Sequence, residues 1–270
     1  FVKAGLNIIS QRKNLGINAL CDISDLNKIP DEETLGYKLG PKINAAGRIG
    51  SSDIGVNLLI SKDISKANEL ASKLYQLIEK RKKLINNSTL EAIGMVESEK
   101  NKIGKLPDFL FLVSKNWNEG IIGILAGKIK EKYNRPCCVI SLGQNHSKGS
   151  ARSIANIPIG EYFLEALDKK LLLKGGGHDL AAGLTIENNK IQMFKDFLIS
   201  KVKHASQENE LVSEISVTSE LSISALNSDL MDWIKKLGPW GQGNPIPKFL
   251  IRDVIAVSYT HLRAHETKAN

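Results

Sequence analysis

The chain has 270 residues, of which 42% are hydrophobic and 24% are charged, and its formal net charge is +8. This length and apolar content suffice for two domains that each bury a core, which excludes a largely disordered chain. No window approaches about eighteen uninterrupted apolar residues, and the amino-terminal sequence lacks the regions of a secretory signal. We therefore expect a cytoplasmic protein that does not associate with membranes.

The basic balance and the cysteines narrow the choice of partners only slightly. An excess of 37 Lys and Arg over 29 Asp and Glu is compatible with a polyanionic partner and equally with a lysine-rich surface. Cys21, Cys137 and Cys138 form no CxxC pair and no Cys/His spacing typical of zinc, so we interpret them as buried apolar residues. Only seven of the 37 basic residues are arginine, so an arginine inside a small-residue motif stands out.

The first 105 residues are predicted to be mainly helical. A short helix is expected at Val2–Gln11, followed by an Asp- and Pro-containing loop and the small-residue segment Leu39–Gly50. From Ile64 to about Glu99, apolar residues recur at intervals of three or four, which predicts one long helix. Such a helix would span roughly 50 Å, and we expect it to bridge two lobes.

Residues 106–203 alternate between apolar runs and helical patterns. Strands are predicted at 108–114, 136–142, 148–154 and 183–187, and helices at 121–132, 159–167 and 191–203. Because helices separate the strands, we predict an α/β fold with mainly parallel strands.

The last part of the chain is predicted to be a separate region. The polar stretch His204–Glu210 is interpreted as a linker, and the alternation over Glu214–Ile223 predicts a half-buried strand. A helix is expected at Asp229–Leu237, then an irregular Gly- and Pro-rich segment, then strand-like residues at Phe249–Val257. Residues 258–270 have no periodicity, so we interpret them as a non-native tail and exclude them from the fold prediction.

Three segments place an arginine or a histidine among residues with almost no side chain. They are Asn44–Arg48, Lys148–Ser153 and Gly175–His178. Small residues let a ligand approach backbone N–H groups, while a guanidinium can hold a phosphate with two hydrogen bonds. Ser150 and Arg152 would share one side of an extended strand, so the pattern predicts an anion site. Each segment alone is also explained without a ligand, by a glycine turn, a helix-capping Arg48 or an exposed His178.

The tryptophans are interpreted in two ways. Trp117 and Gly120 precede a predicted helix, so either the helix amino terminus faces an anion or Trp117 covers the core. Trp233 and Trp240 are predicted to be packing residues. Aromatic residues make up only 6% of the chain, too few to suggest a ladder of base-stacking platforms.

No pattern in the sequence indicates a metal site. The sequence has no DxD, HxH, His-His or HExxH segment, although a phosphodiester hydrolase usually needs clustered acidic or histidine ligands. The amino-terminal carboxylates are interpreted as solvated turn residues: Asp22, Asp25, Asp31 and Glu32. His261 and His265 lie in the tail and are not considered as ligands.

Five ordered segments resemble the RecJ branch of the DHH phosphoesterase superfamily. They are LGPKINAAGRIG from Leu39, SKNWNEGIIGILAGKIKEKYNRP from Ser114, KGSARSI from Lys148, KGGGHDLAAG from Lys174 and LGPWGQGNPIPKF from Leu237. The resemblance covers residues 1–257. The first and last segments favour this branch over the shorter nanoRNase and cyclic-dinucleotide phosphodiesterase relatives.

The resemblance implies an organisation of the chain into domains. Residues 1–60 would be the end of a DHH domain and 61–105 a connecting helix. Residues 106–203 would form the α/β DHH-associated, substrate-binding domain, and 204–257 the start of an OB-type β-barrel, followed by the tail at 258–270.

The resemblance also implies roles for individual residues. Arg48, Ser150 and Arg152 would hold the terminal 5′ phosphate or the adjacent backbone. His178 would contact the scissile phosphate, and Asn44 would belong to a motif that faces the metal centre. Other residues expected at the substrate are Gly47, Trp117, Gly175, Gly176 and Gly177.

The function implied is that of a single-stranded-DNA-specific 5′ to 3′ exonuclease in DNA repair and recombination, in which metal-activated water hydrolyses phosphodiesters. The ligands of the two Mn²⁺ or Mg²⁺ ions would precede Phe1, so we expect this piece of a longer protein to hold no metal and to be inactive alone. Single-strand-binding protein and a helicase are expected partners of a monomer. The alternatives are a non-catalytic single-stranded nucleic-acid-binding module and an oligoribonuclease or cyclic-dinucleotide phosphodiesterase relative.

Overall fold

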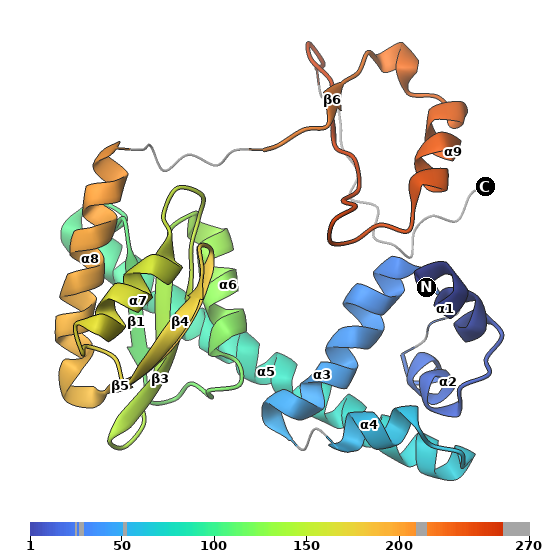
Figure 1. Cartoon of the computed structure of the whole chain (residues 1–270), viewed down its shortest axis with the longest axis horizontal. Coiled ribbons are helices and arrows are strands. Elements are labelled where there is room, and N and C mark those ends of the chain that lie inside the picture. Colours follow the sequence, from blue (N-terminus) through green and yellow to red (C-terminus); the bar gives the residue numbers. More distant parts are fainter. Residues whose placement is uncertain (25, 27–29, 51–52, 209–214, 256–270) are drawn as a thin grey trace. The chain divides into compact units, whose positions relative to one another are not determined.

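The chain consists of two compact units, Ala4–Ser213 and Glu214–Asn270 with Phe1–Lys3. The computed structural model describes residues 1–24, 26, 30–50, 53–208 and 215–255. In the larger unit, a helical region is followed by a layered α/β region (Figure 1). No helix among the described residues is long and apolar enough to cross a membrane.

Short helices form the amino-terminal region. They are α1 (Val2–Ser10), α2 (Leu15–Asp22), a π-helix (Thr34–Leu39), α3 (Gly40–Ile49) and α4 (Asp53–Leu59). The first confirms the helix predicted at Val2–Gln11. The small-residue segment, for which no regular element was predicted, forms α3, where Pro41 lies at a favourable position in the first turn. Ala45 and Ala46 are fully buried, because small side chains let α3 pack closely against the long helix that follows.

The predicted long helix is confirmed and extends further than expected. Helix α5 (Ile64–Ile103) has 40 residues and is therefore about 60 Å long. It begins at Asp63, whose side chain accepts hydrogen bonds from the backbone N–H groups of Ser65 and Lys66. It ends at Gly104, which has a φ of 80° that favours glycine.

A five-stranded sheet forms the centre of the α/β region. Its strands are β1 (Leu110–Ser114), β2 (Cys137–Ser141), β3 (His146–Arg152), β4 (Lys174–His178) and β5 (Ala181–Glu187). Their order is β1-β2-β3-β5-β4, and only β1 and β2 pair in parallel, so the prediction of mainly parallel strands is wrong. The reason is that residues 142–145 and 179–180 are connections of hairpin length, which join antiparallel strands.

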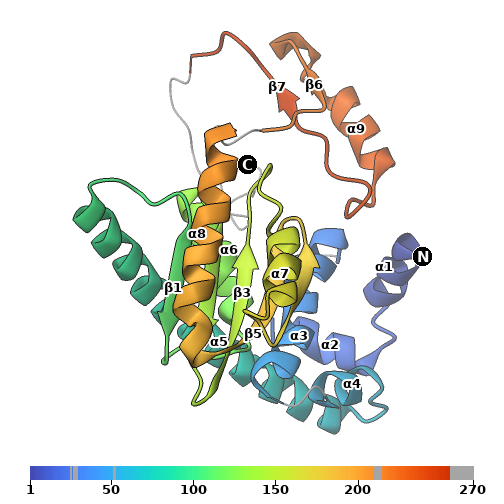
Figure 2. The ribbon, with the colours of Figure 1, turned by 60° about the vertical axis from the view of Figure 1, so that its left-hand side comes forward.

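Helices cover the two faces of this sheet unequally. Helices α7 (Ile159–Asp168) and α8 (Ile191–Glu208) lie on one face, where Phe163 and Phe194 are fully buried (Figure 2). On the other face, α5 packs against β1, and α6 (Ile122–Tyr133) packs against β2 and also lies against β3. This second layer leaves the corresponding face of β3, β5 and β4 without a buried cluster among the described residues.

The smaller unit contains little regular structure among its described residues. Strands β6 (Ser219–Glu220) and β7 (Phe249–Leu250) pair in parallel, and helix α9 (Ser228–Leu237) confirms the predicted helix. The half-buried strand predicted at 214–223 is wrong, because β6 has two residues and both are exposed. The linker predicted at 204–210 is wrong for residues 204–208, because they belong to helix α8, which ends at Glu208. The tail interpreted at 258–270 lies outside the described residues.

Candidate functional site

On strands β3, β5 and β4, one face is covered by α7 and α8, and the other, which we call the open face, is approached by α6 at β3. Two rows of paired residues run across them, Ser150–Gly183–Gly176 and Arg152–Ala181–His178. Paired residues in antiparallel strands point to the same face, so Ser150, Arg152 and His178 share the open face. The alternate residues Ala151 and Ala182 are buried on the covered face. The predicted common side of Ser150 and Arg152 is therefore confirmed.

A cavity of about 480 Å³ lies on the open face. It is bounded by the end of α3, the loop before α6, the first turn of α6, and strands β3 and β5. Arg48, Lys148 and Arg152 line it together with a single acidic residue, Glu119, among the residues that the structure describes. Because three cations face one carboxylate, the cavity favours an anionic ligand.

Arg152 is held in place by its own strand. Its Nη1 donates to Ser150 Oγ at 3.1 Å and to the Ala151 carbonyl oxygen at 2.8 Å. The facing turn of α6 contains Gly123, where an added Cβ would lie 3.3 Å from Arg152 Nη2. The two hydrogen bonds therefore restrict the orientation of this half-buried guanidinium, and the absence of a side chain at Gly123 leaves space for it.

Arg48 lies in the last turn of α3 and is exposed. Its Nη1 donates to the Gly120 carbonyl oxygen at 3.4 Å. A Cβ at Gly120 would lie 2.0 Å from the Arg48 carbonyl oxygen, so the loop backbone touches the end of α3 and only glycine fits there. Residues that are 72 positions apart in the sequence thus form one wall of the cavity.

A second arginine increases the positive charge near Arg48. Arg81 on α5 has a buried Nε with no hydrogen-bond partner. Burial, and to a smaller extent the positive charge of Arg48, lowers the pKa of Arg81. Sequence reasoning missed Arg81, because a basic residue in a long polar helix is ordinarily solvated.

The acidic residue of the cavity is paired. Lys148 Nζ lies 2.6 Å from Glu119 Oε2, and both side chains are more than half exposed. Sequence reasoning missed both residues as members of the site. The alternation of Lys148, Ser150 and Arg152 along one strand is the signal that identifies Lys148, whereas no local signal identifies Glu119.

Trp117 does not line the cavity. Its side chain is 2% exposed, and its indole Nε1 donates to Glu91 Oε2 at 3.0 Å. Ser141 Oγ donates to the Trp117 carbonyl oxygen at 2.6 Å. Trp117 therefore belongs to the core beneath the loop, which agrees with the interpretation that it covers the core.

The structure brings His178 to the open face but not into the cavity. His178 is exposed at the end of β4, two strands from Arg152, which corresponds to about 10 Å between backbones. The glycines 175–177 lie in β4, so the interpretation of this segment as a glycine turn is wrong. Asn44 is exposed one helical turn before Arg48 and does not line the cavity, whereas Gly47 does.

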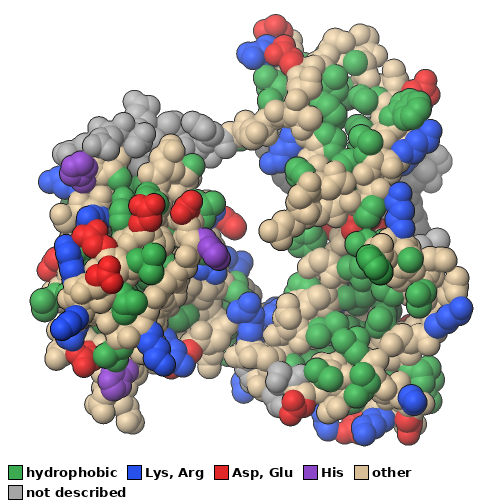
Figure 3. All heavy atoms as spheres, in the orientation of Figure 1, with side chains coloured by type: hydrophobic (Ala, Val, Ile, Leu, Met, Phe, Trp, Pro, Cys, Tyr) green, Lys and Arg blue, Asp and Glu red, His purple; other side chains and the backbone are tan. Residues whose placement is uncertain are grey.

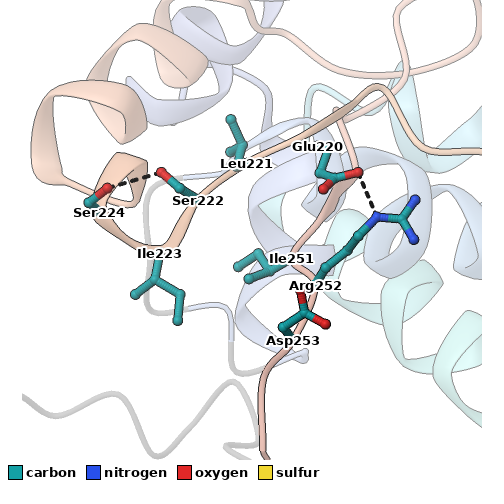
Figure 4. Close-up of a pocket in the computed structure, with 8 residues that line it drawn as sticks. All are labelled: Glu220, Leu221, Ser222, Ile223, Ser224, Ile251, Arg252 and Asp253. Atoms are coloured by element: carbon teal, nitrogen blue, oxygen red, sulfur yellow. Dashed lines mark hydrogen bonds and ion pairs between the residues drawn. The ribbon is translucent and has the colours of Figure 1, made fainter.

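A different hollow occurs in the smaller unit. Glu220–Ser224 and Ile251–Asp253 line it, and Arg252 Nε pairs with Glu220 Oε2 at 2.7 Å (Figure 4). Its arginine is neutralised, so it lacks the excess of cations found on the sheet. In the same unit Trp233 is 64% exposed and lies under Lys236 Nζ, 4.2 Å from the ring centroid, so its prediction as a packing residue is wrong.

The described residues do not fit a metal centre. No group of three His, Cys, Asp or Glu side chains among them could hold an ion, and the histidines on the face shown in Figure 3 lie apart. The three cysteines are free and buried, as predicted. Burial raises the pKa of Cys137 to about 12 and that of Cys138 well above its usual value, which keeps both thiols protonated.

Comparison with known families agrees with this division of the chain. Residues 107–204 match the DHHA1 domain, and residues 217–268 match the RecJ OB domain. The first match runs from just before β1 into α8, so the α/β region that carries the cavity is a DHHA1 domain. The second match reaches into the segment that was interpreted as a tail.

Two relatives of the chain share one name. The chain is 34% identical over 250 residues to single-stranded-DNA-specific exonuclease RecJ of Haemophilus influenzae. This alignment covers 90% of this chain and 43% of the relative. It is 30% identical to the Bacillus subtilis protein of the same name, over 97% of this chain and 33% of the relative. The chain belongs to the RecJ family and spans less than half the length of these relatives.

A solved structure supports the same assignment. Crystalline RecJ of Thermus thermophilus in complex with Mn²⁺ superposes with a TM-score of 0.78 at 27% identity. The alignment covers 93% of this chain and 36% of that chain. The same protein in complex with Mg²⁺ gives a TM-score of 0.77 over 91% of this chain and 37% of that chain.

Proposed function

We propose that the cavity on the open sheet face binds the 5′-terminal phosphate of single-stranded DNA. The observation that supports this proposal best is the convergence of Arg48 from α3 with Ser150 and Arg152 from β3 on one cavity. A phosphate monoester carries close to two negative charges at neutral pH, which complements the excess of two positive charges in the cavity. The guanidinium groups would hold its oxygens while Ser150 Oγ contributes a further hydrogen bond.

The open face extends beyond the cavity toward His178. We propose that His178 and the glycines 175–177 contact the phosphate next along the strand, since glycine lets the nucleic-acid backbone approach closely. Asn44, one turn before Arg48, would lie toward the reacting end. In this arrangement the residues of the chain bind and orient the DNA and neutralise its charge.

The activity that we propose for the whole protein is 5′ to 3′ exonuclease action on single-stranded DNA in repair and recombination. Its support is the name that the relatives share, and the T. thermophilus structures with Mn²⁺ or Mg²⁺ support dependence on a divalent ion. Because the described residues do not fit a metal site, no catalytic step is assigned to them.

We also propose a domain organisation for the chain. Residues 1–60 would belong to a DHH domain, 61–105 to the connector, 106–203 to the DHH-associated domain and 204–257 to the OB domain. Single-strand-binding protein and a helicase are proposed partners of a monomer in the cytoplasm.

A binding assay with matched oligonucleotides tests the site. The chain should bind a 3′-labelled single strand with a 5′ phosphate more tightly than the same strand with a 5′ hydroxyl, and Arg152→Ala should lower the affinity for the first by about tenfold or more. Arg12→Ala, which removes an exposed arginine paired with Asp22 outside the cavity, is the control. Equal losses on both strands would contradict the phosphate assignment.

A further inference from the structure

Glu91, on the long helix α5, forms hydrogen bonds that reach the cavity only indirectly. Its Oε1 accepts from Ser114 Oγ at 2.7 Å, and its Oε2 accepts from Trp117 Nε1 at 3.0 Å. Both bonds have a charged acceptor and are therefore stronger than bonds between neutral groups. One half-buried carboxylate thus joins α5 to the end of β1 and to the loop that follows it.

These bonds hold the first half of the loop between β1 and α6. Ser114 Oγ also accepts from the backbone N–H of Asn116 at 3.1 Å. Trp117 is held at its indole by Glu91 and at its carbonyl oxygen by Ser141 of β2. A residue that is anchored at both ends and 2% exposed cannot shift without breaking these bonds.

The second half of the loop forms the wall of the cavity. Asn118 Oδ1 accepts from the Gly120 N–H at 2.8 Å, and the Asn118 carbonyl oxygen accepts from the Ile121 N–H at 3.0 Å. Gly120 in turn contacts Arg48, by the hydrogen bond of 3.4 Å and by the close approach of its Cα to the Arg48 carbonyl oxygen. A displacement of Trp117 would therefore be transmitted along the loop to Gly120 and Arg48.

We propose that Glu91 is a positioning residue for the cavity, which acts through Trp117 and Gly120 to set the place of Arg48. Glu91 does not line the cavity, so its effect on a bound phosphate is conformational. This inference rests on the proposed phosphate-binding function. It assigns to the connecting helix a role in recognition of the 5′ end.

The test compares two glutamates on the same helix. Glu97 Oε1 accepts from Tyr133 Oη at 2.7 Å, so Glu97 also joins α5 to the α/β layer but lies outside the loop and the cavity. The quantity measured is the ratio of dissociation constants for 5′-hydroxyl and 5′-phosphate strands, with the 270-residue chain. Glu91→Ala should lower this ratio by about tenfold, because a displaced Arg48 loses about one charged hydrogen bond to the 5′ phosphate. Glu97→Ala should leave the ratio unchanged.

A conservative variant separates positioning from general loss of structure. In Glu91→Gln the amide oxygen still accepts from Trp117 and the amide N–H donates to Ser114 Oγ, so the ratio should return to within about threefold of the unmodified chain. If Glu91→Ala does not fold, Trp117→Phe, which removes the indole N–H and keeps an aromatic ring, should lower the ratio.

The outcomes distinguish this inference from the proposed function. If the unmodified chain prefers a 5′ phosphate but Glu91→Ala and Trp117→Phe keep that preference, Glu91 is not a positioning residue. If the unmodified chain shows no preference, the proposed phosphate site itself is wrong.

Discussion

The two faces of strands β3, β5 and β4 carry opposite kinds of residue. On the covered face, Ala151, Leu184 and Ile186 pack with the aromatic side chains of α7 and α8. On the open face, glycine is present at Gly183, where no packing requires it: an added Cβ would meet only the Gly149 carbonyl oxygen, at 3.9 Å, among the described residues. At Gly176 an added Cβ would meet nothing within 4 Å, and the φ of 157° is the reason for glycine there. Burial therefore explains residue choice on one face only, and Gly183 and the cations that line the cavity on the other face fit a ligand.

Removing an aromatic ring from the covered face should have the largest effect on stability. Phe194 is fully buried and packs edge-on against Phe163, with ring centroids 5.4 Å apart. Phe194→Ala should lower the free energy of unfolding by about 3–5 kcal/mol, measured by urea denaturation. The preference for a 5′ phosphate should be unchanged at a temperature where the variant remains folded, because the ring lies on the opposite face from the cavity. A change in that preference would contradict the separation of the two faces.

The contact between the loop and α3 should be sensitive to a single methyl group. Gly120→Ala places a Cβ 2.0 Å from the Arg48 carbonyl oxygen, so the loop must move, which should reduce stability by about 1–3 kcal/mol. Selectivity for a 5′ phosphate should fall with it in the oligonucleotide assay.

Gly127→Ala, on α6, is the matched control for this substitution. An added Cβ there meets nothing within 4 Å among the described residues, so the change should stabilise the helix by up to about 1 kcal/mol. Equal behaviour of the two variants would show that the loop does not touch α3 in solution.

Strand β2 is buried on both faces, in contrast to β3, β5 and β4, and its Cys137 should make the stability of the chain depend on pH. Burial raises the pKa of Cys137 to about 12 from its ordinary value of 9.0. Above about pH 9 the unfolded thiol ionises while the folded thiol stays protonated, so this contribution to stability is complete below that pH and is lost as the pH rises toward about 12.

Denaturation of the chain and of Cys137→Ala at about pH 8 and about pH 10 measures this effect. The unmodified chain should lose up to about 1.4 kcal/mol more per pH unit than the variant in the upper part of this window. Identical slopes would show that the thiol is accessible to water.

A substitution on the open face should have the smallest effect on stability. Gly183→Thr adds a β-branched residue suited to a strand, at a position with open space, so the free energy of unfolding should change by about 0.5 kcal/mol or less. Because Gly183 lines the cavity, the affinity for a 5′-phosphorylated strand should nevertheless decrease. Unchanged affinity would place the phosphate elsewhere on this face.

Much of the fold was predictable because its elements leave local signals. The three-to-four spacing of apolar residues predicted α5, and the bounded apolar runs predicted β1 and β2. Strand β4 was missed because Gly175–Gly177 carry no side chains that could show an alternation. The strand direction was predicted wrongly, because the connections at 142–145 and 179–180 contain no helix and are short enough to join antiparallel strands.

The candidate site was predicted in part. Arg48, Ser150 and Arg152 were identified from the small residues around them, and all three line one cavity. His178 was grouped with them but lies two strands from Arg152. Glu119 and Glu91 left no signal, since a carboxylate in a polar loop or on a long helix is usually solvated.

The sequence by itself determined that α5, α6 and α9 form, that Asp63 and Gly104 cap α5, and that Ser150 and Arg152 lie on one side of a strand. These properties depend on backbone geometry and on neighbours within a few residues. Only the tertiary structure decided that Gly120 touches Arg48 and that a cavity forms on the open face between α6 and strands β3 and β5. Such contacts join distant segments, and they depend on strand order and helix packing, which local patterns do not encode.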